Sequence, residues 1–307
     1  MPIVFMGSPA FAVPSLYALA ARYPVAGVVT QPDRPSGRGR RLTPPPVKAA
    51  ALELQLPVFQ PARMRDPDAL ARLKAWSPDM IVVAAYGQIL RPPVLELPPH
   101  GCLNVHASLL PRWRGAAPIQ AAIAAGDAQS GVTIMLMDSG IDTGPILAQR
   151  KTSILGHWTG GRLGEELATL GAELLVETLP VYLDGRLHPN PQPAEGTTYS
   201  PLLKKDDGRI DPRLPTVRLA LQVRAFEPWP GSFLSWRGLR IVVREAQAIS
   251  GRPAEAGLIT LMEGTPAIRC SDGWLALQRV QPAGKRPMTG EEFARGTPDF
   301  IGSLITP

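Results

Sequence analysis

The sequence contains few of the residues on which disulfide-stapled and metal-dependent proteins rely. Its 307 residues include two cysteines, Cys102 and Cys270, and only four histidines. The cysteines lie far apart, and neither a CxxC pair nor an HExxH motif occurs, so the usual patterns of disulfide frameworks and zinc sites are missing. No stretch approaches the roughly 18 consecutive apolar residues of a membrane-spanning helix. We therefore expect neither a metal site nor a membrane association.

Two further patterns are missing from the amino-terminal stretch. Met1 is followed by a strand-like apolar run, without the basic and apolar regions of a secretory signal, so we expect a cytoplasmic protein. The sequence Gly7-Ser8-Pro9-Ala10 is not GxGxxG, and Pro9 stands where a phosphate-binding loop would offer a backbone amide. The first turn therefore argues against a nicotinamide cofactor.

Length and composition favour two globular domains. The chain exceeds a typical single domain, and 45% apolar residues suffice for two hydrophobic cores. The formal net charge is +6, and residues 186–307 carry more of the positive excess than residues 1–185 do. Such a charge is compatible with a polyanionic partner but does not identify one.

The hydrophobic pattern predicts an α/β domain over residues 1–185. Short apolar strands alternate with apolar helices, and the continuous apolar run at 80–86 indicates a central strand. A strand of this kind belongs in an open, twisted and mostly parallel sheet. We expect a helix over 115–125 and a further strand over 132–137. The carboxyl end of that last strand would then lie at the edge where open α/β sheets bind ligands.

The remainder of the chain is organised differently. Periodicity disappears over residues 186–205, which are rich in proline, glycine and polar residues, so this stretch is predicted to be a linker. Residues 206–307 contain one helical pattern, followed by several short runs of strand-like alternation separated by turns. Strands at this spacing are typical of a small antiparallel β-barrel.

The segment from Gln31 to Pro46 is long and basic and has no helical or strand periodicity. It contains Arg34, Arg38, Arg40 and Arg41 but a single acidic residue, Asp33. Long segments without regular structure in compact domains are usually functional or disordered. Arginine suits bidentate contacts with phosphates and stacking on bases. The segment is therefore a candidate nucleic-acid contact, and the alternative is a solvated basic loop.

The stretch from Gly101 to Asp142 brings together polar residues of three kinds in an otherwise apolar or glycine-rich run. Asn104 and His106 lie two positions apart in a predicted strand, so both side chains should leave the same side of the sheet. Pro111 lacks an amide donor and ends the strand pattern. Asp142 follows the next strand and could close on His106. An isolated histidine at such a place is more often a satisfied structural residue than a catalytic one.

An amide, an imidazole and a carboxylate without a nucleophilic serine or cysteine suit acyl or formyl transfer to an amine. The amide can donate to a developing oxyanion, and the imidazole can donate a proton or a hydrogen bond. The carboxylate can favour the charged imidazole and assist removal of the amine proton. Asn104, His106 and Asp142 are therefore the predicted catalytic residues.

Several motifs along the chain together resemble those of the 10-formyltetrahydrofolate-dependent formyltransferases, and among them the methionyl-tRNA formyltransferase family. The active-site pattern is Asn104-x-His106-x-Ser108-Leu109-Leu110-Pro111, with Arg114-Gly115 and Asp142. Further matching motifs are Gln31-Pro32-Asp33-Arg34-Pro35, Pro57-Val58-Phe59-Gln60-Pro61, Ala85-Tyr86-Gly87, Arg224-Ala225-Phe226 with Pro228-Trp229-Pro230, and Gln281-Pro282-Ala283-Gly284-Lys285. The resemblance covers nearly the whole chain.

The resemblance implies a Rossmann-like catalytic domain, an OB-like barrel, 10-formyltetrahydrofolate as cosubstrate, initiator methionyl-tRNA as acceptor and a monomer. It assigns folate contacts to ten residues: Gly87, Gln88, Ile89, Leu90, Ser108, Leu109, Leu110, Pro111, Asp138 and Gly140. With the basic composition, it assigns tRNA contacts to Arg34, Arg38, Arg40, Arg41, Lys204, Lys205, Lys285 and Arg286. Asn104 and His106 would stabilise the oxyanion, and Asp142 would orient and charge His106.

Three alternatives remain at this stage. A formyltransferase acting on a sugar amine or a glycinamide nucleotide is disfavoured, because a small acceptor needs neither the arginine-rich segment nor a second domain. A non-enzymatic RNA-binding module would give Asn104, His106 and Asp142 no reason to converge. Hydrolysis of formylated folate would require water at the place of the acceptor amine.

Overall fold

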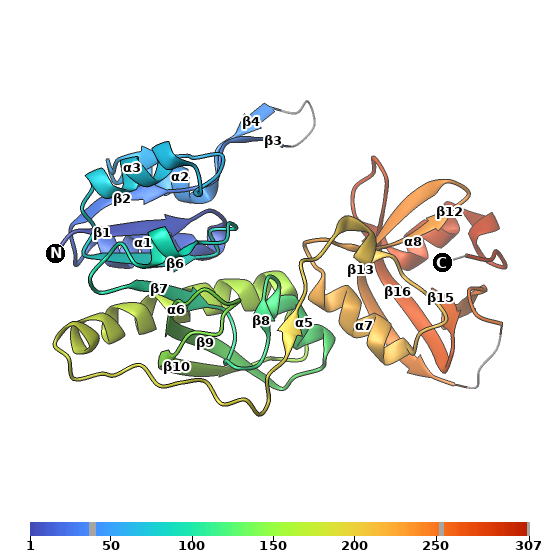
Figure 1. Ribbon diagram of the computed structural model, residues 1–307. Helices are drawn as coiled ribbons and strands as arrows, with labels where there is room; N and C mark the ends of the chain where they lie inside the picture. Colours follow the sequence, from blue (N-terminus) through green and yellow to red (C-terminus); the bar gives the residue numbers. More distant parts are fainter. Residues whose placement is uncertain (37–40, 252–254, 306–307) are drawn as a thin grey trace. The chain divides into compact units, whose positions relative to one another are not determined.

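The computed structural model describes residues 1–36, 41–251 and 255–305 (Figure 1). The chain forms two compact units. The first comprises Met1–Pro118, Gln129–Ser153 and Gly164–Ser200, and the second comprises Ile119–Ala128, Ile154–Leu163 and Pro201–Pro307. The domain bounds inferred from the sequence, 1–185, 186–205 and 206–307, stay a prediction.

A seven-stranded, mostly parallel sheet forms the middle of the first unit. Its order is β10-β9-β7-β6-β1-β2-β5. The strands are β1 (Ile3–Gly7), β2 (Val25–Val29), β5 (Val58–Phe59), β6 (Met80–Ala84), β7 (Cys102–His106), β9 (Gln129–Leu136) and β10 (Ile146–Ser153). All residues of β1, β6 and β7 are buried, which explains their nearly continuous apolar sequences. The predicted α/β architecture and the central position of β6 are confirmed.

Helices cover this sheet. They are α1 (Val13–Ala20), α2 (Pro46–Glu53), α3 (Pro67–Ala75), the short α4 (Pro92–Leu95) and the long α6 (Gly160–Leu183), with a 3-10 turn, η1, at Ala10–Ala12. Proline starts α2 and α3, where its missing amide costs no hydrogen bond. Gly171 of α6 lies so close to β7 and β9 that an added Cβ would be 2.8 Å from a methyl group of Val105. Glycine therefore lets this helix approach the sheet closely.

The direction of β9 corrects one prediction. It runs antiparallel to β7, with Leu136 opposite Leu103 and Thr133 opposite His106. The loop after β9 therefore starts beside the amino end of β7, and not at the carboxyl edge of the parallel strands. A parallel return needs a crossover packed on the sheet. The only helix between the two strands, α5 (Pro118–Ala124), falls almost entirely in the second unit instead.

The predicted helix over 115–125 begins later than expected, at Pro118. Gly115 has φ of 109°, which no helical residue adopts. Arg114–Gly115 instead form a short strand, β8, which pairs in parallel with β11 (Tyr199–Ser200). Since β11 lies inside the predicted linker, that stretch is not devoid of structure.

The basic segment also departs from its predicted irregular form. Arg34–Ser36 (β3) and Arg41–Thr43 (β4) form an antiparallel ribbon in which Arg34 is opposite Thr43. Local pairing of this kind leaves no periodic hydrophobic signal because neither face is part of a core. Arg38 and Arg40 lie outside the described residues.

The second unit is built on an antiparallel sheet, as predicted for the carboxyl-terminal β domain. Its order is β12-β13-β16-β15-β14, with β17 paired to β16. The strands are β12 (Ser232–Trp236), β13 (Leu239–Ser250), β14 (Ile259–Met262), β15 (Thr265–Cys270), β16 (Gly273–Pro282) and β17 (Met288–Thr289). The remaining elements are η2 (Lys205–Gly208), α7 (Thr216–Ala225), α8 (Gly290–Arg295) and η3 (Pro298–Phe300). Leu219 and Val223 of α7 join Ile241 and Val243 of β13 in the core.

None of the helices in the described part of the chain combines the length and apolar content that a membrane crossing requires.

Candidate active site

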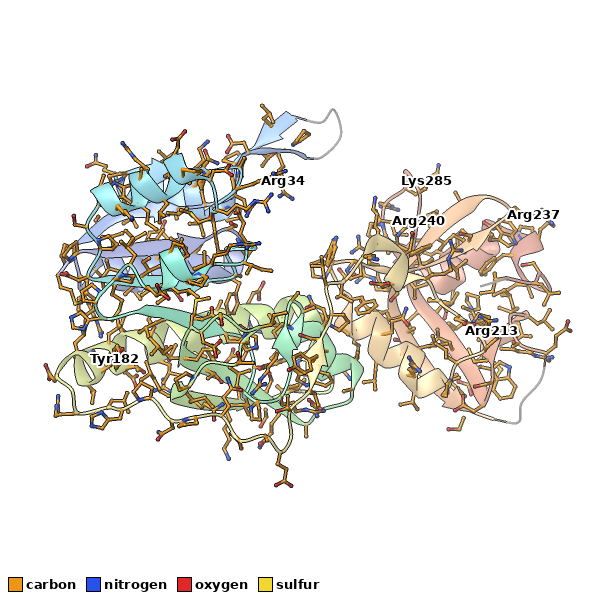
Figure 2. The ribbon with its side chains drawn as sticks, in the orientation of Figure 1. Arg34, Tyr182, Arg213, Arg237, Arg240 and Lys285 are labelled. Carbon is orange, nitrogen blue, oxygen red and sulfur yellow. The ribbon has the colours of Figure 1, made fainter. Side chains whose placement is uncertain are left out.

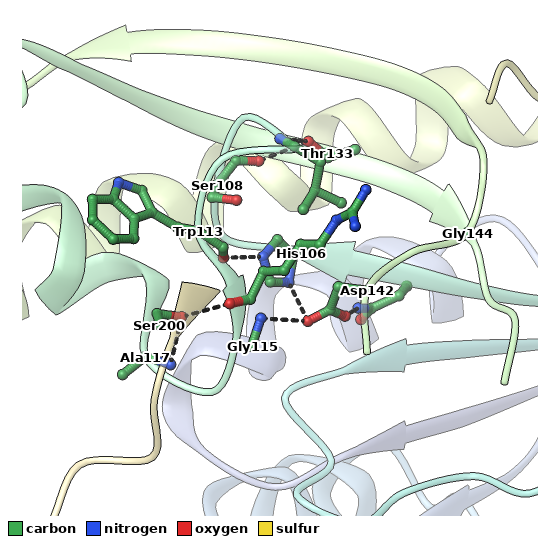
Figure 3. A network of polar contacts seen from close by, with 12 residues as sticks. His106, Ser108, Trp113, Gly115, Ala117, Thr133, Asp142, Gly144 and Ser200 are labelled. Atoms are coloured by element: carbon green, nitrogen blue, oxygen red, sulfur yellow. Dashed lines mark hydrogen bonds and ion pairs between the residues drawn. The ribbon is translucent and has the colours of Figure 1, made fainter. Parts of the chain in front are cut away.

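The structure brings Asn104, His106 and Asp142 together. Figure 3 shows His106 beside Asp142. Asn104 and His106 alternate with Val105 in β7, and both are buried, with 8% and 5% of their surface exposed. Asn104 Nδ2 donates to Asp142 Oδ1 at 3.2 Å. His106 Nδ1 lies 3.6 Å from Asp142 Oδ2. The loop after β9 thus folds back and places its carboxylate over the polar face of β7.

The second ring nitrogen of His106 also has a partner. His106 Nε2 lies 3.0 Å from the backbone oxygen of Trp113. A carbonyl oxygen can only accept, so Nε2 carries a proton in this contact. Nδ1 at the same time faces a carboxylate, which also only accepts. Both ring nitrogens of His106 therefore face oxygen atoms of the protein.

Asp142 is held by its backbone as well as by its side chain. Its φ is 52°, in the left-handed region that few residues other than glycine adopt. Gly115 N donates to Asp142 Oδ2 at 2.9 Å. The carboxylate therefore accepts from Asn104 and Gly115 while facing His106. Asp138 stabilises the same loop, since its Oδ1 accepts from Gly140 N at 3.0 Å and from Thr143 Oγ1 at 2.7 Å.

The residues from Ser108 to Pro111 follow β7 after Ala107 and form a turn held by hydrogen bonds. Ser108 Oγ donates to the Arg112 oxygen at 2.6 Å. Thr133 Oγ1 donates to the Ser108 oxygen at 2.7 Å and accepts from Leu110 N at 3.1 Å. Ser108 and Leu110 are almost completely buried. Their polar groups are thus used inside the turn, and a folate contact of these residues stays a prediction.

The residues from Gly87 to Leu90 follow β6, and therefore lie at the same edge of the sheet as the carboxyl end of β7. Gln88 Oε1 accepts from Met64 N at 2.7 Å, and Leu90 is buried. Ile89 between them has 79% of its surface exposed. The segment is thus anchored on either side of an exposed apolar side chain.

Sequence reasoning missed the residues of 190–200, which it assigned to a linker. Gln192 contacts the backbone of Asp142 and the guanidinium of Arg114. Thr198 Oγ1 accepts from Trp113 N at 2.8 Å, and Ser200 Oγ donates to the Arg114 oxygen at 3.1 Å. Polar residues between prolines give no periodic signal, so only the folded chain reveals that they line the back of the site.

The base of the basic ribbon is also fixed by side chains. Lys48 Nζ lies 2.8 and 2.7 Å from the two oxygens of Asp33, and Gln60 Nε2 donates to Asp33 Oδ1 at 2.7 Å. Hydrogen bonds from Gln60 and Lys48 lower the pKa of the Asp33 carboxyl. The motifs that contain Asp33 and Gln60 are far apart in the sequence and are in contact here.

Of the predicted basic contacts in this segment, Arg34 is exposed, and its Nη2 donates to Gln31 Oε1 at 3.2 Å. Arg41 begins β4.

The predicted basic contacts of the second unit are exposed. Lys204 and Lys205 lie beside Asp206 and Asp207, whereas Lys285 and Arg286 lie in the turn between β16 and β17. Sequence reasoning missed Arg240, whose guanidinium carbon lies 3.5 Å from the centre of the Phe233 ring. Ala283 N donates to the Arg240 oxygen at 3.0 Å, so Arg240 belongs to the same surface as Lys285 (Figure 2).

Neither cysteine is a candidate nucleophile. Burial raises the pKa of Cys102 to about 12 and that of Cys270 to about 12, so both thiols are protonated near neutral pH. The described residues contain no cluster of three or more His, Cys, Asp or Glu side chains that could hold a metal ion.

Comparisons with known proteins identify the family of the chain. Residues 2–179 match the formyl transferase family, and residues 202–298 match the formyl transferase carboxyl-terminal domain. The chain is 49% identical to the methionyl-tRNA formyltransferase of Myxococcus xanthus, over 96% of this chain and 94% of the relative. It is 50% identical to that of a Roseiflexus species, over 96% and 92%.

Solved structures share the fold. A sugar 3N-formyl transferase, crystallised in the presence of dTDP and 5-N-formyl-THF, has a TM-score of 0.67 at 17% identity, covering 93% of this chain and 99% of its own. A methionyl-tRNA formyltransferase from Clostridium thermocellum has a TM-score of 0.56 at 17% identity, covering 81% and 94%. At these identities the likeness concerns the fold alone. The assignment rests on the matches to both family domains and on relatives that are 49% and 50% identical over most of the chain. The chain belongs to the formyl transferase family and, within it, to the methionyl-tRNA formyltransferases.

Proposed function

We propose that the protein transfers the formyl group of 10-formyltetrahydrofolate to the α-amino group of methionine on initiator tRNA. The observation that carries the proposal is the cluster of a buried amide, a buried imidazole and a partly exposed carboxylate at one end of β7. It contains groups that stabilise an oxyanion and move a proton, but no side-chain nucleophile. The names of the curated relatives supply the acceptor. Location in the cytoplasm and a monomeric state stay predictions.

The reaction needs little activation of the acceptor. An α-amine has a reference pKa of about 8, so a useful fraction is neutral at physiological pH. The amine nitrogen attacks the formyl carbon, a carbon–nitrogen bond forms, and the carbonyl electrons move to oxygen. When the tetrahedral oxyanion collapses, the bond to the folate nitrogen breaks and that nitrogen takes up a proton. The attacking amine loses one proton in exchange.

Asn104 is the proposed direct donor to the oxyanion. One of its N–H groups is directed at Asp142 Oδ1, and a primary amide has a second to offer. The bond to Asp142 fixes the plane of the amide before substrate arrives. Fixed donors of this kind typically contribute roughly 10²–10³ in rate.

His106 acts mainly through its charge. Both of its nitrogens face protein acceptors, Trp113 O and Asp142 Oδ2. Direct donation to the oxyanion therefore requires that one of these contacts be exchanged for substrate. A buried imidazolium beside the formyl oxygen stabilises the oxyanion even without such an exchange. Asp142 keeps the ring charged and oriented, and its carboxylate assists removal of the amine proton.

The folate would bind beside this cluster. The exposed side chain of Ile89 and the backbone of 87–90 lie at the sheet edge that also ends β7, which suits an aromatic pterin with hydrogen-bonding edges. Ser108–Pro111 would form the adjoining wall. Asp138 and Gly140 would contribute by holding the loop that carries Asp142.

The tRNA would be bound by two basic regions. The first contains Arg34, which is exposed next to the Asp33–Lys48 pair, and the same sequence segment contributes Arg38, Arg40 and Arg41 as predicted contacts. In the second unit the candidates are the exposed Lys204, Lys205, Lys285 and Arg286, with Arg240 added by the structure. Contacts of this kind bind phosphates without reading sequence.

Acceptor competition tests the proposal. The purified protein is incubated with 10-formyltetrahydrofolate and either methionyl-initiator tRNA, methionyl-elongator tRNA or an amino-sugar nucleotide, and the formylated product is identified by mass spectrometry. Formyl-methionine released from the initiator tRNA is the expected product. Formylation of the amino-sugar nucleotide alone, or release of formate without a formylated acceptor, would overturn the proposal.

A further inference from the structure

Gln192 makes an unusually complete set of hydrogen bonds behind the active site. Its Nε2 donates to the backbone oxygens of Asp142 and Gly144, both at 2.8 Å. Its Oε1 accepts from Arg114 Nε at 3.0 Å and from Arg114 Nη2 at 2.7 Å. All four hydrogen-bonding positions of the amide are therefore occupied. Gln192 lies between the two stretches that match the family, 2–179 and 202–298.

The chemistry of the partners fixes the orientation of this amide. Two carbonyl oxygens can only accept, and a guanidinium can only donate. Turning the amide over would set two N–H groups against Arg114 and an oxygen against two oxygens. Gln192 is thus a rigid link between Arg114 and the loop that carries Asp142.

The link acts on the catalytic loop at its most constrained residue. Asp142 has φ of 52°, and Gln192 binds the oxygen of this same residue. Gly115, which follows Arg114, binds its carboxylate at 2.9 Å. Backbone and side chain of Asp142 are therefore both tied to the segment containing Arg114. Without Gln192, a small rotation of the loop would carry the carboxylate away from Asn104 and His106.

The same stretch of chain supports the other partner of His106. Thr198 Oγ1 accepts from Trp113 N at 2.8 Å, and Thr198 O accepts from Arg114 N at 2.9 Å. Trp113 in turn offers its oxygen to His106 Nε2. Asn190 exchanges two backbone hydrogen bonds with Ile146, just beyond the catalytic loop. Residues Asn190–Ser200 thus hold both acceptors between which His106 sits.

We propose that Gln192 and Arg114 are positioning residues that fix Asp142 for formyl transfer, and that Thr198 does the same for the Trp113 carbonyl. This inference rests on the proposed function. These side chains act through Asp142 and Trp113 and not on the reacting atoms. Loss of the positioning should lower kcat and leave the KM values for tRNA and folate nearly unchanged, because misplacement of a catalytic group by about 1 Å can cost up to roughly 10²-fold in rate.

The test exchanges Gln192 for an apolar residue of similar length. Gln192→Met removes all four hydrogen bonds, and we expect kcat to fall about 10- to 100-fold. Gln129→Met is the matched control, because Gln129 is exposed and its side chain has no hydrogen bond within the described part of the chain. Thr198→Val, nearly the same shape, should lower kcat by a smaller factor. Thermal unfolding of each variant shows whether the fold is retained.

A double-mutant cycle separates positioning from a general structural role. Gln192→Met is combined with Asp142→Asn, and the transfer step is followed in single turnovers with enzyme in excess. If Gln192 acts through Asp142, its exchange should have little further effect once the carboxylate is gone. A kcat of Gln192→Met equal to that of Gln129→Met, or a full additive loss in the double variant, would overturn the proposal. Absence of methionyl-tRNA formylation by the unaltered protein would instead overturn the proposed function.

Discussion

The region around Asp142 and the basic surfaces are built in opposite ways. The carboxylate of Asp142 accepts from Asn104 and Gly115 and faces His106, and its backbone is bound by Gln192. Arg34 and Lys285, by contrast, are exposed and project from a ribbon and a turn. A network with fixed donors and acceptors suits a reaction in which charge develops at one atom. Exposed, adaptable cations suit a phosphate backbone whose charges are spread over a long surface. Changes in the first region should alter kcat, and changes in the second should alter tRNA affinity.

The largest effect is expected when the oxyanion donor is removed. Asn104→Ala should lower kcat by roughly 10²–10³-fold, since one fixed donor to the tetrahedral intermediate is lost. The KM for tRNA should stay within about twofold, because Asn104 is buried and uncharged, unlike the exposed cations that are proposed to bind tRNA. Single-turnover rates at saturating tRNA and folate measure the first quantity, and initial rates at varied tRNA measure the second.

Ser139→Ala is a suitable control for Asn104→Ala. Ser139 is an exposed residue in the loop that carries Asp142, and no contact of its side chain is present within the described ranges. Its exchange should leave both constants unchanged. A tRNA KM that rises in Asn104→Ala as much as kcat falls would remove the distinction between the two regions.

A smaller effect is expected at the base of the ribbon, where fixed hydrogen bonds support exposed cations. Asp33 is the one acidic residue in the basic segment, and it is bound by Lys48 and Gln60. Asp33→Asn keeps the size of the side chain but weakens its contacts with Lys48 and Gln60. The ribbon should then be less restrained and should lose more conformational entropy when tRNA binds. We expect the KM for tRNA to rise about fivefold, with kcat at saturation unchanged. Asp66→Asn, at an exposed position without a described side-chain bond, is the control.

The pH dependence sharpens this prediction. The hydrogen bonds from Gln60 and Lys48 lower the pKa of Asp33 in the folded protein. The ionised carboxylate therefore stabilises the folded state at pH values above the ordinary pKa of an aspartate. This contribution is lost only when the pH falls through the lowered pKa. The carboxylate is therefore charged throughout a range of about pH 6.5 to 8. The ratio of the tRNA KM values of Asp33→Asn and the unaltered protein should be constant over this range. A ratio that approaches one at the acidic end of the range would contradict the assigned interaction.

The same contrast decides how much the sequence could reveal. Asn104 and His106 were predictable because a two-residue spacing in an apolar strand places both side chains on one face. The central β6 was predictable because strands buried on both sides are apolar throughout. The direction of β9 was not, since antiparallel and parallel strands have the same apolar pattern, and the choice depends on where α5 packs. The prediction that Asp142 converges with His106 assumed that β9 ends at the carboxyl edge of the parallel strands, which is wrong. Asp142 reaches His106 because the loop after β9 folds back over β7.

Residues whose role depends on tertiary contacts left no local signal. Gln192 lies in a proline-rich stretch with the composition of a linker, and its importance is visible only from its four side-chain hydrogen bonds. Arg240 lies in a strand and was indistinguishable from a solvated surface charge until its position over Phe233 was known. The resemblance to formyltransferases supplied the ligand assignments, which neither pattern nor spacing could have given.

The smallest expected effects concern single cations of the second unit, and they are best measured through salt. Arg240 stacks on Phe233 and has no described ion pair, and Lys285 is exposed in the turn beside it. If each contacts one phosphate, Arg240→Gln and Lys285→Gln should each weaken tRNA binding a fewfold and reduce the slope of log affinity against log salt by about 1. Arg213 is the matched control, because Asp211 already neutralises it through contacts of 2.9 and 2.8 Å and it lies elsewhere on the unit (Figure 2). Arg213→Gln should leave the slope unchanged, and an equal change in all three variants would mean that net charge, and not this surface, attracts the tRNA.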